Sequence, residues 1–213
     1  MSYREEEQDM NTPRLETQRL ILRRFEEEDI GALFLLLKDE EVNTFLPWFP
    51  AKSTEETWDF YNNRVAVQYK KEQGCFYAIC LKEDNVPLGY IKAEADDSHD
   101  FGYALRKEFW HRGIVTEAGE AVVEQLKKEG LPYITATHDR NNLRSGGVMR
   151  RLGMRYQYSY EEQWQPKNFP VVFRMYQLNF DGEASWVYRK YWDLYDVHYI
   201  EEIESPYTVC CKT

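Results

Sequence analysis

The sequence has few cysteines and no long apolar run. Four of its 213 residues are cysteine, namely Cys75, Cys80, Cys210 and Cys211. They follow neither the spacing of zinc ligands nor the density of a disulfide-stapled secreted domain, which favours a reducing compartment. The first residues lack the apolar core of a signal peptide, and no later run is long enough to cross a bilayer. We therefore expect a cytoplasmic protein without a membrane partner.

The sequence also lacks an excess of basic residues. Its 27 lysines and arginines face 37 acidic residues, and the formal net charge is -10 at pH 7. Such a charge repels nucleic-acid phosphates, and no basic patch is evident along the chain, so we expect no nucleic-acid partner. A cationic partner suits the charge better. Hydrophobic residues make up 43% of the chain, which predicts one packed domain.

Hydrophobic periodicity predicts alternating strands and helices. A strand, two helices and an antiparallel meander of three strands come first; then a helix near Thr116, a strand, a short helix and a closing pair of strands follow. The expected ranges are 14–25, 26–42, 55–72, 75–84, 86–96, 99–107, 116–126, 131–139, 142–152, 154–164 and 169–180. Ser53 or Thr54 can cap the second helix, and Gly74 can end it. This order indicates a mixed α/β fold.

The segment EFWHRGIVTEAGEAVVEQL places a glycine directly before a helical pattern. The free N–H groups and the positive dipole end of such a helix bind phosphate. Gly113 allows close backbone approach, Arg112 adds positive charge, and Thr116 can cap the helix or donate a hydroxyl. An ordinary strand-to-helix turn explains the same residues, so this motif alone is weak.

The segment NNLRSGGVMRRLGM adds a second polar helix start. Asn142 and Ser145 are three residues apart and therefore share one face, with Asn142 in the capping position. Capping alone explains Asn142, and Ser145 can be a plain surface residue. Gly146 and Gly147 each cost a helix about 1 kcal/mol relative to alanine, which suggests that a neighbour needs bare backbone there. Gly153 is placed to end the helix.

Three segments in this order resemble the GNAT acyltransferases, and within them the RimJ/RimL-like N-acetyltransferases. They are LETQRLILR, GYALRKEFWHRGIVTEA and NNLRSGGVMRRLGM, and the resemblance covers residues 14–180. It implies an α/β (α+β) fold with a mixed, mostly antiparallel, twisted sheet flanked by helices. That sheet splays apart between the strand before and the strand after the cofactor-binding helix, near Thr135 and Thr137. Residues 1–13 are then a polar N-terminal segment, and residues 181–213 an extension.

The resemblance implies an N-acetyltransferase that takes acetyl-CoA as cosubstrate and passes the acetyl group to a primary amine within a ternary complex. Neither a metal nor a covalent intermediate is needed. The strand at Tyr103, Ala104 and Leu105 is expected to lie along the pantetheine arm. The pyrophosphate is expected on the loop and helix start formed by His111, Arg112, Gly113, Ile114, Val115 and Thr116, and Asn142 and Ser145 complete the cofactor contacts.

The sequence departs from the family pattern at three positions. His111 stands where glycine is common, and Val115 where glycine or alanine is frequent. Met149 occupies the position of the tyrosine that many family members use to protonate the thiolate. Ser145 then becomes the expected proton donor, beside Asn142.

The base that removes the amine proton is less well marked in the sequence. Glu94 is the candidate, with Asp100 and His138 behind it. Each of the three residues can also be a solvated or structural group. Two other functions stay open: a non-catalytic acyl-CoA sensor and a protein-interaction module. The acceptor can be a small molecule or a protein N-terminus.

Aromatic residues recur at helical spacing in the extension, and five of them would share one helical face: Tyr188, Tyr191, Trp192, Tyr195 and Tyr199. Such a face is expected to be covered, either by the chain's own domain or by a partner subunit, so the protein is a monomer or a homodimer.

Overall fold

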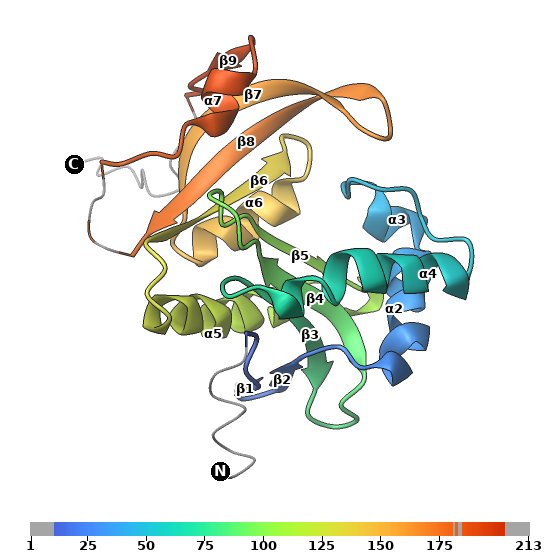
Figure 1. Cartoon of the computed structure of the whole chain (residues 1–213). Helices are drawn as coiled ribbons and strands as arrows, with labels where there is room; N and C mark the ends of the chain where they lie inside the picture. The colour runs from blue at the N-terminus through green and yellow to red at the C-terminus, as the bar shows by residue number, and fades with distance from the viewer. Residues whose placement is uncertain (1–10, 181, 183–184, 203–213) are drawn as a thin grey trace, which may run out of the picture.

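The structure is a computed structural model that describes residues 11–180, 182 and 185–202. Two sheets form its framework (Figure 1). The first sheet has the order β1-β2-β3-β4-β5 and is antiparallel throughout, with strands Leu15–Glu16, Leu20–Arg23, Cys75–Leu81, Pro87–Ala93 and Phe101–Leu105. Of the four cysteines, Cys210 and Cys211 lie outside the described residues, while Cys75 and Cys80 are free and buried.

The second sheet contains the strands that follow the long helix. Its order is β6-β8-β7-β9, also antiparallel, with strands Tyr133–Asp139, Phe169–Asn179, Arg155–Trp164 and His198–Tyr199. The helices are α2 Ile30–Leu37, α3 Glu40–Asn43, α4 Thr54–Phe60, α5 Ile114–Lys128, α6 Leu143–Arg151 and α7 Lys190–Leu194. Other helical turns, of 3-10 or π type, are η1 Glu27–Asp29, η2 Tyr61–Val65, η3 Gln68–Lys70 and η4 Lys107–Phe109.

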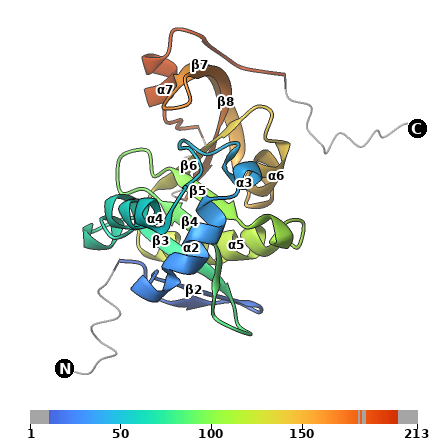
Figure 2. The same ribbon diagram turned by 90° about the vertical axis from the view of Figure 1, so that its right-hand side faces the viewer.

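Helices cover both faces of the first sheet, as Figure 2 shows for α2 and α4 on one side of β3 and β4 and α5 on the other. Alternate residues of β3 point into the two layers: Phe76 belongs to the apolar cluster that includes Leu33 of α2, and Tyr77 to the cluster that includes Val122 of α5. Because side chains alternate along a strand, a strand covered on both faces is apolar throughout. The predicted meander and mixed α/β fold are confirmed.

Three predicted elements in the first half are wrong in detail. Residues 26–42 do not form one helix, because α2 ends at Leu37 and the extended backbone of Asp39 precedes α3. Residues 14–25 form a hairpin of β1 and β2 instead of one strand, closed by a hydrogen bond from the Thr17 N–H to the Leu20 carbonyl at 3.0 Å. Residues 55–72 are not α-helical throughout: α4, capped by Ser53, ends at Phe60 and continues directly into the π-helical turn η2, and the 3-10 turn η3 ends before the extended backbone of Lys71.

The extension does not form one long helix, contrary to the prediction. Among its described residues, 182 and 185–202, only the five of α7 are α-helical, and β9 pairs with β7 through Ser159↔Tyr199 and Tyr160↔His198. The strand pairing satisfies backbone groups that a continued helix would have bonded internally, and it turns the chain back along β7. The aromatic residues Tyr188, Tyr191, Trp192 and Tyr195 pack on the second sheet of the same chain.

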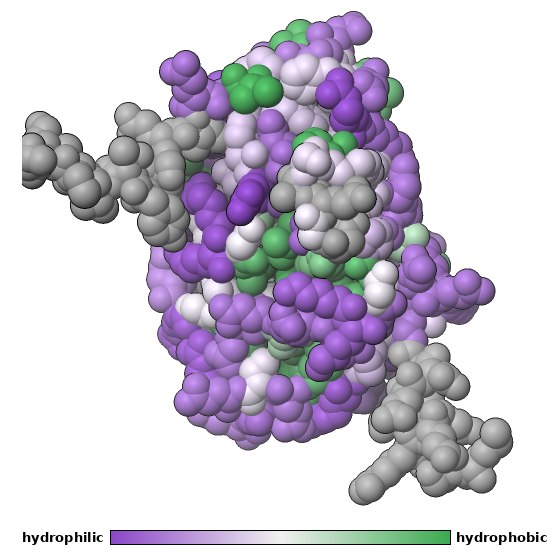
Figure 3. Space-filling model, turned by 90° about the vertical axis from the view of Figure 1, so that its left-hand side faces the viewer, coloured by the Kyte–Doolittle hydropathy of each residue, from purple (hydrophilic) through white to green (hydrophobic). Residues whose placement is uncertain are grey.

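The surface in the view of Figure 3 is mostly hydrophilic, with small hydrophobic areas near its middle. No helix in the described part of the chain combines the length and the apolar character needed to span a bilayer.

Candidate active site

A cleft of about 1810 Å³ lies between the two sheets. The start of α5, the strand β5 and the start of α6 line one part of it. The end of β4, the strand β7 and the extension line another part. The cleft thus brings together the residue groups that the sequence places far apart.

The cleft exists because the two sheets separate where β5 and β6 meet. The only bridge between these strands in the described residues is the parallel pair Asp100↔Thr135, beside a 3.4 Å hydrogen bond from the Thr135 N–H to the His99 carbonyl. The far edge of β5 at Tyr103 therefore has no strand partner in this part of the chain. An open strand edge can pair with an extended, amide-containing ligand. The predicted splay is confirmed.

The helix start differs slightly from the expectation. Gly113 is the N-cap of α5 with φ 71°, and the helix begins at Ile114, so Thr116 is not its cap. A Cβ on Gly113 would meet its nearest neighbour only at 3.8 Å, so the left-handed backbone, rather than lack of space, requires glycine. His111 also has a positive φ of 61°, a conformation that glycine adopts at no steric cost.

Side chains from the turn between β1 and β2 hold this loop from behind. Glu117, in the first turn of α5, accepts hydrogen bonds from the Thr17 hydroxyl at 2.5 Å and from the Arg19 Nε at 2.6 Å. The Arg19 Nη1 also donates to the Arg112 carbonyl at 3.0 Å. The acidic side chain near the helix start is thereby neutralised, and the open N–H groups of α5 are left facing the cleft.

Two arginines beside the loop rest on aromatic rings. The guanidinium of Arg112 lies 5.4 Å from the centre of the Phe109 ring, and that of Arg144 lies 4.6 Å from the Trp110 ring. Trp110 is itself fixed by a 2.7 Å hydrogen bond from its Nε1 to the Leu105 carbonyl. Stacked arginines keep their charge and their donors available for an anion. This end of the cleft is therefore suited to phosphate groups.

Asn142 and Ser145 lie where the sequence places them. The Asn142 side chain caps α6 by accepting from the Ser145 N–H at 3.3 Å. The Ser145 Oγ lies 3.0 Å from the hydroxyl of Tyr103, which also donates to the Ser145 carbonyl at 2.9 Å. The Tyr103 hydroxyl can also donate to the Ser145 Oγ, and the Ser145 hydroxyl is then left to donate into the cleft. The two hydroxyls form a connected pair in the cleft.

Sequence reasoning missed the role of the Tyr103 side chain, because only the backbone of this residue was expected to contact the cofactor. Burial raises the pKa of Tyr103 above its usual value, while the bond to Ser145 lowers it. Its hydroxyl therefore keeps its proton at neutral pH and acts as a donor. The alternation of β5 places this side chain toward α6, a direction that depends on the packing of the two elements.

The position of the His138 ring explains why residue 146 is glycine. A Cβ at Gly146 would lie 2.7 Å from the His138 Nε2, so the ring requires the bare backbone that the sequence suggested. The His138 Nδ1 lies 2.7 Å from the Asp139 carbonyl, and burial lowers the pKa of the imidazole. Its Nε2 is buried against α6. Met149 is also buried and belongs to the main core.

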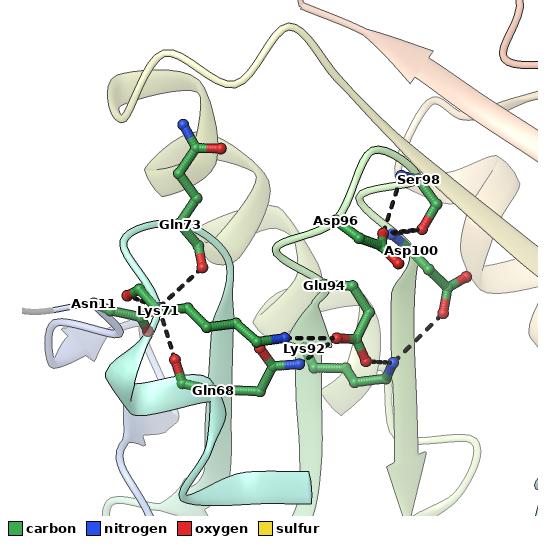
Figure 4. Close-up of polar contacts among 9 residues, drawn as sticks. All are labelled: Asn11, Gln68, Lys71, Gln73, Lys92, Glu94, Asp96, Ser98 and Asp100. Atoms are coloured by element: carbon green, nitrogen blue, oxygen red, sulfur yellow. Dashed lines mark hydrogen bonds and ion pairs between the residues drawn. The ribbon is translucent and has the colours of Figure 1, made fainter.

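The candidate base Glu94 belongs to a charged cluster (Figure 4). Its carboxylate lies 2.5 Å from the Lys92 Nζ and accepts a short hydrogen bond from Gln68. Lys92 also lies 3.5 Å from Asp100, so one ammonium group serves two carboxylates. Burial raises the pKa of Asp100, and Lys92 opposes this rise. Two of the candidate bases, Glu94 and Asp100, are thus brought together, with a lysine that sequence reasoning missed.

Aromatic side chains surround the remaining part of the cleft. Tyr160 stacks on Tyr191 and on Tyr195, with ring centres 5.1 Å and 4.8 Å apart. All three line the cleft, together with Glu162 and Trp164 of β7. The spacing of aromatics in the extension signalled that they are covered, but it did not indicate which surface covers them.

The comparisons with known proteins agree with this geometry. Residues 19–155 match the family model of the acetyltransferase (GNAT) domain. The chain is 27% identical over 143 residues to a Bacillus subtilis (strain 168) protein named uncharacterized N-acetyltransferase YnaD, covering 65% of this chain and 81% of that protein.

Solved structures share the fold. A GNAT-family acetyltransferase from Bacillus anthracis is 22% identical with a TM-score of 0.68, covering 79% of this chain and 99% of its own. The RimL ribosomal L7/L12 alpha-N-protein acetyltransferase, solved with coenzyme A, is 21% identical with a TM-score of 0.69, covering 78% and 96%. The family match spans well over half of the chain, so the protein belongs to the GNAT acetyltransferase family.

Proposed function

We propose that the protein transfers the acetyl group of acetyl-CoA to a primary amine by direct attack within a ternary complex. One observation carries this proposal: a single cleft contains the glycine-started α5, the Ser145–Tyr103 pair and the Lys92–Glu94–Asp100 cluster. These are, respectively, an anion site, a proton donor and a pair of carboxylates that can supply the base.

The residues present fit coenzyme A. The pyrophosphate would meet the open N–H groups of α5 at Ile114, Val115 and Thr116, with Arg112 and Arg144 beside them. Ile114 contributes only backbone, since its side chain is buried in the core. The pantetheine arm would lie along the open edge of β5 at Tyr103, Ala104 and Leu105. The left-handed backbone at His111 and Gly113 keeps the loop turned toward the cleft.

Acetyl-CoA supplies the acetyl group as a thioester. In the transfer, the amine nitrogen forms a bond to the acetyl carbon, the carbon–sulfur bond breaks, and one proton leaves nitrogen while sulfur gains one. The Ser145 hydroxyl, backed by Tyr103, donates toward the sulfur as negative charge develops there. Asn142 positions Ser145 by capping α6. Most of the rate gain is expected from orientation and from these preplaced donors.

Glu94 remains the proposed base, acting directly or through water. Its carboxylate is held by Lys92 and Gln68 at the edge of the cleft, and Asp100 is the second candidate across the same lysine. His138 is assigned a structural role, because its Nε2 is buried against Gly146.

We also infer the class of acceptor, the oligomeric state and the cellular location of the enzyme. The RimL structural neighbour is described as an alpha-N-protein acetyltransferase of ribosomal L7/L12, which supports an amine acceptor without naming one for this chain. The aromatic extension packs on its own sheet, which favours a monomer. The cysteine pattern and charge favour the cytoplasm. A non-catalytic acyl-CoA sensor would not require the Ser145–Tyr103 pair, so we place it second.

The cofactor site is tested by two matched glycine variants at opposite ends of α5. Gly113 and Gly130 both have left-handed backbone, with φ values of 71° and 81°, and neither has a neighbour closer than 3.8 Å to an added Cβ. Gly113→Val and Gly130→Val therefore carry similar backbone strain. We expect only Gly113→Val to weaken CoA binding by tenfold or more in calorimetry. Equal CoA affinity in both variants would contradict the placement of the pyrophosphate.

A further inference from the structure

The extension is fixed to the second sheet by polar contacts as well as by aromatic packing. The Tyr158 hydroxyl donates to the Tyr188 carbonyl at 2.8 Å, and the Tyr188 N–H donates to the Gln177 side chain at 2.9 Å. Further along, Glu201 pairs with Arg174 of β8. The segment between these anchors is thereby held against β7. It lies beyond residues 19–155, which the GNAT family model matches.

This anchoring makes the extension a wall of the cleft. Tyr191, in α7, and Tyr195, directly after it, stack on Tyr160 with interplanar angles of 17° and 10°. Tyr160 is almost fully buried between them and the sheet, and the three rings border the same cleft as Ser145 and Glu94. The extension therefore shapes the space that faces the proposed site of transfer.

Glu162 is the acidic residue of this wall. Residues two apart on a strand share a face, so Tyr160, Glu162 and Trp164 of β7 point together into the cleft. Glu162 is partly buried, which raises the pKa of its carboxyl, while the Tyr195 hydroxyl lowers it. No ion pair involves Glu162 within residues 11–180, 182 and 185–202.

Two other acids of the cleft, Glu94 and Asp100, differ in this respect, because they already share Lys92. A partly buried carboxylate without a cation is costly, and aromatic ring faces attract positive charge. A ligand that brings an ammonium group to Glu162 would supply the missing charge. The net charge of -10 favours the approach of such a cation.

Near Trp164, the end of this wall is connected to the end of α3. Lys167, in the β7–β8 turn, donates through Nζ to the carbonyls of Asn43 and Thr44 at 2.6 Å and 3.0 Å. The same ammonium lies 5.1 Å from the Trp164 ring centre. The bridge joins the β7–β8 hairpin to the end of α3, two elements that Figure 1 shows on the same side of the molecule. It limits the space beyond Trp164, which favours a small ligand over a long peptide.

We propose that the acceptor is a small dibasic amine: one amino group attacks the thioester, while the second, protonated, pairs with Glu162 beside Trp164 and the Tyr160–Tyr195 stack. This inference rests on the proposed acetyl-CoA-dependent transfer. Glu162 and the extension then decide which amine is accepted, and the Ser145–Tyr103 pair serves the chemistry.

Three acceptors with the same four-carbon chain test the charge requirement: putrescine, n-butylamine and γ-aminobutyric acid. A charge-assisted contact predicts that kcat/KM for putrescine exceeds that for n-butylamine by about tenfold to a hundredfold. γ-Aminobutyric acid should be the poorest acceptor, because its carboxylate would face Glu162. A peptide with a basic second residue serves as the macromolecular comparison. Thiol release measures all four.

Variants at neighbouring residues of β7 test whether Glu162 causes the preference for putrescine. Glu162→Gln should reduce the putrescine to n-butylamine ratio to about one, because the amide keeps the shape and removes the charge. Glu161→Gln is the matched control, since Glu161 is exposed on the opposite face of β7, and it should leave the ratio unchanged. Tyr195→Ala should raise KM for putrescine more than it changes kcat.

Several results would overturn the inference. Equal kcat/KM for putrescine and n-butylamine in the unmodified enzyme would do so, as would a preference that survives Glu162→Gln. An equal loss of turnover on both amines in Glu162→Gln would instead assign Glu162 to proton removal. Turnover on the peptide alone would exclude a small acceptor. If no amine is acetylated and CoA gives no thermal shift, the proposed function itself fails.

Discussion

The pair formed by Ser145 and Tyr103 allows a sharp test of the chemistry. Ser145→Ala removes the hydroxyl nearest the proposed sulfur position, and Tyr103→Phe removes the hydroxyl that lies 3.0 Å from the Ser145 Oγ and 2.9 Å from its carbonyl. If both act in one donor chain, each single change removes the same function. The double variant should then be little slower than either single variant.

The expected losses in kcat and in stability follow from the hydrogen bonds that each variant removes. Removal of one proton donor or one charge-stabilising hydrogen bond costs about tenfold to a thousandfold in kcat, or roughly 1.4 to 4 kcal/mol of barrier. Tyr103→Phe also loses its ground-state bond to the Ser145 carbonyl, worth about 1 kcal/mol of folding stability. The coupling energy between the two changes should therefore approach the effect of the smaller single change.

The assay is thiol release under saturating amine, with acetyl-CoA affinity measured separately by calorimetry. Kcat should fall while the Kd for CoA stays nearly unchanged, because the donor acts mainly on charge that develops in the transition state. Tyr77→Phe is the control for loss of a phenol: the Tyr77 hydroxyl is buried and has no hydrogen-bond partner among the described residues. It should leave kcat unchanged. Wild-type kcat in Ser145→Ala, or fully additive effects in the double variant, would refute the reasoning.

Two further predictions concern the packing behind the cleft. Gly146→Ala should be at least about 1 kcal/mol less stable than Gly147→Ala in denaturant unfolding, because its Cβ would meet His138 at 2.7 Å whereas that of Gly147 meets only the mobile end of Arg151 at 3.7 Å. Equal stabilities would contradict the contact. Burial lowers the pKa of His138 from 6.5, so the unfolded chain binds its proton more readily and the free energy of unfolding should drop as pH falls below about 6.5. His138→Gln should flatten this part of the pH profile, and an unchanged profile would show that the ring titrates normally.

Local pattern alone determined much of this protein. The alternation in β3 to β5, the helix that follows Gly113 and the cap at Asn142 depend on near neighbours in the chain, because side-chain periodicity and capping geometry are local properties. The order of the three quoted segments was enough to indicate the GNAT family, which the comparison confirms. The bare backbone at Gly146 was also anticipated, although its partner was not.

Tertiary structure decided the remainder. The extension carries a helical aromatic pattern, yet β9 pairs with β7 and the helix stops at Leu194, because long-range backbone pairing overrides local periodicity. The contact of Tyr103 with Ser145 joins residues 42 positions apart, and the shared Lys92 depends on how β4 and β5 are registered. Composition and periodicity specify which residues face a core; only the packing of separate elements decides which polar groups meet in the cleft.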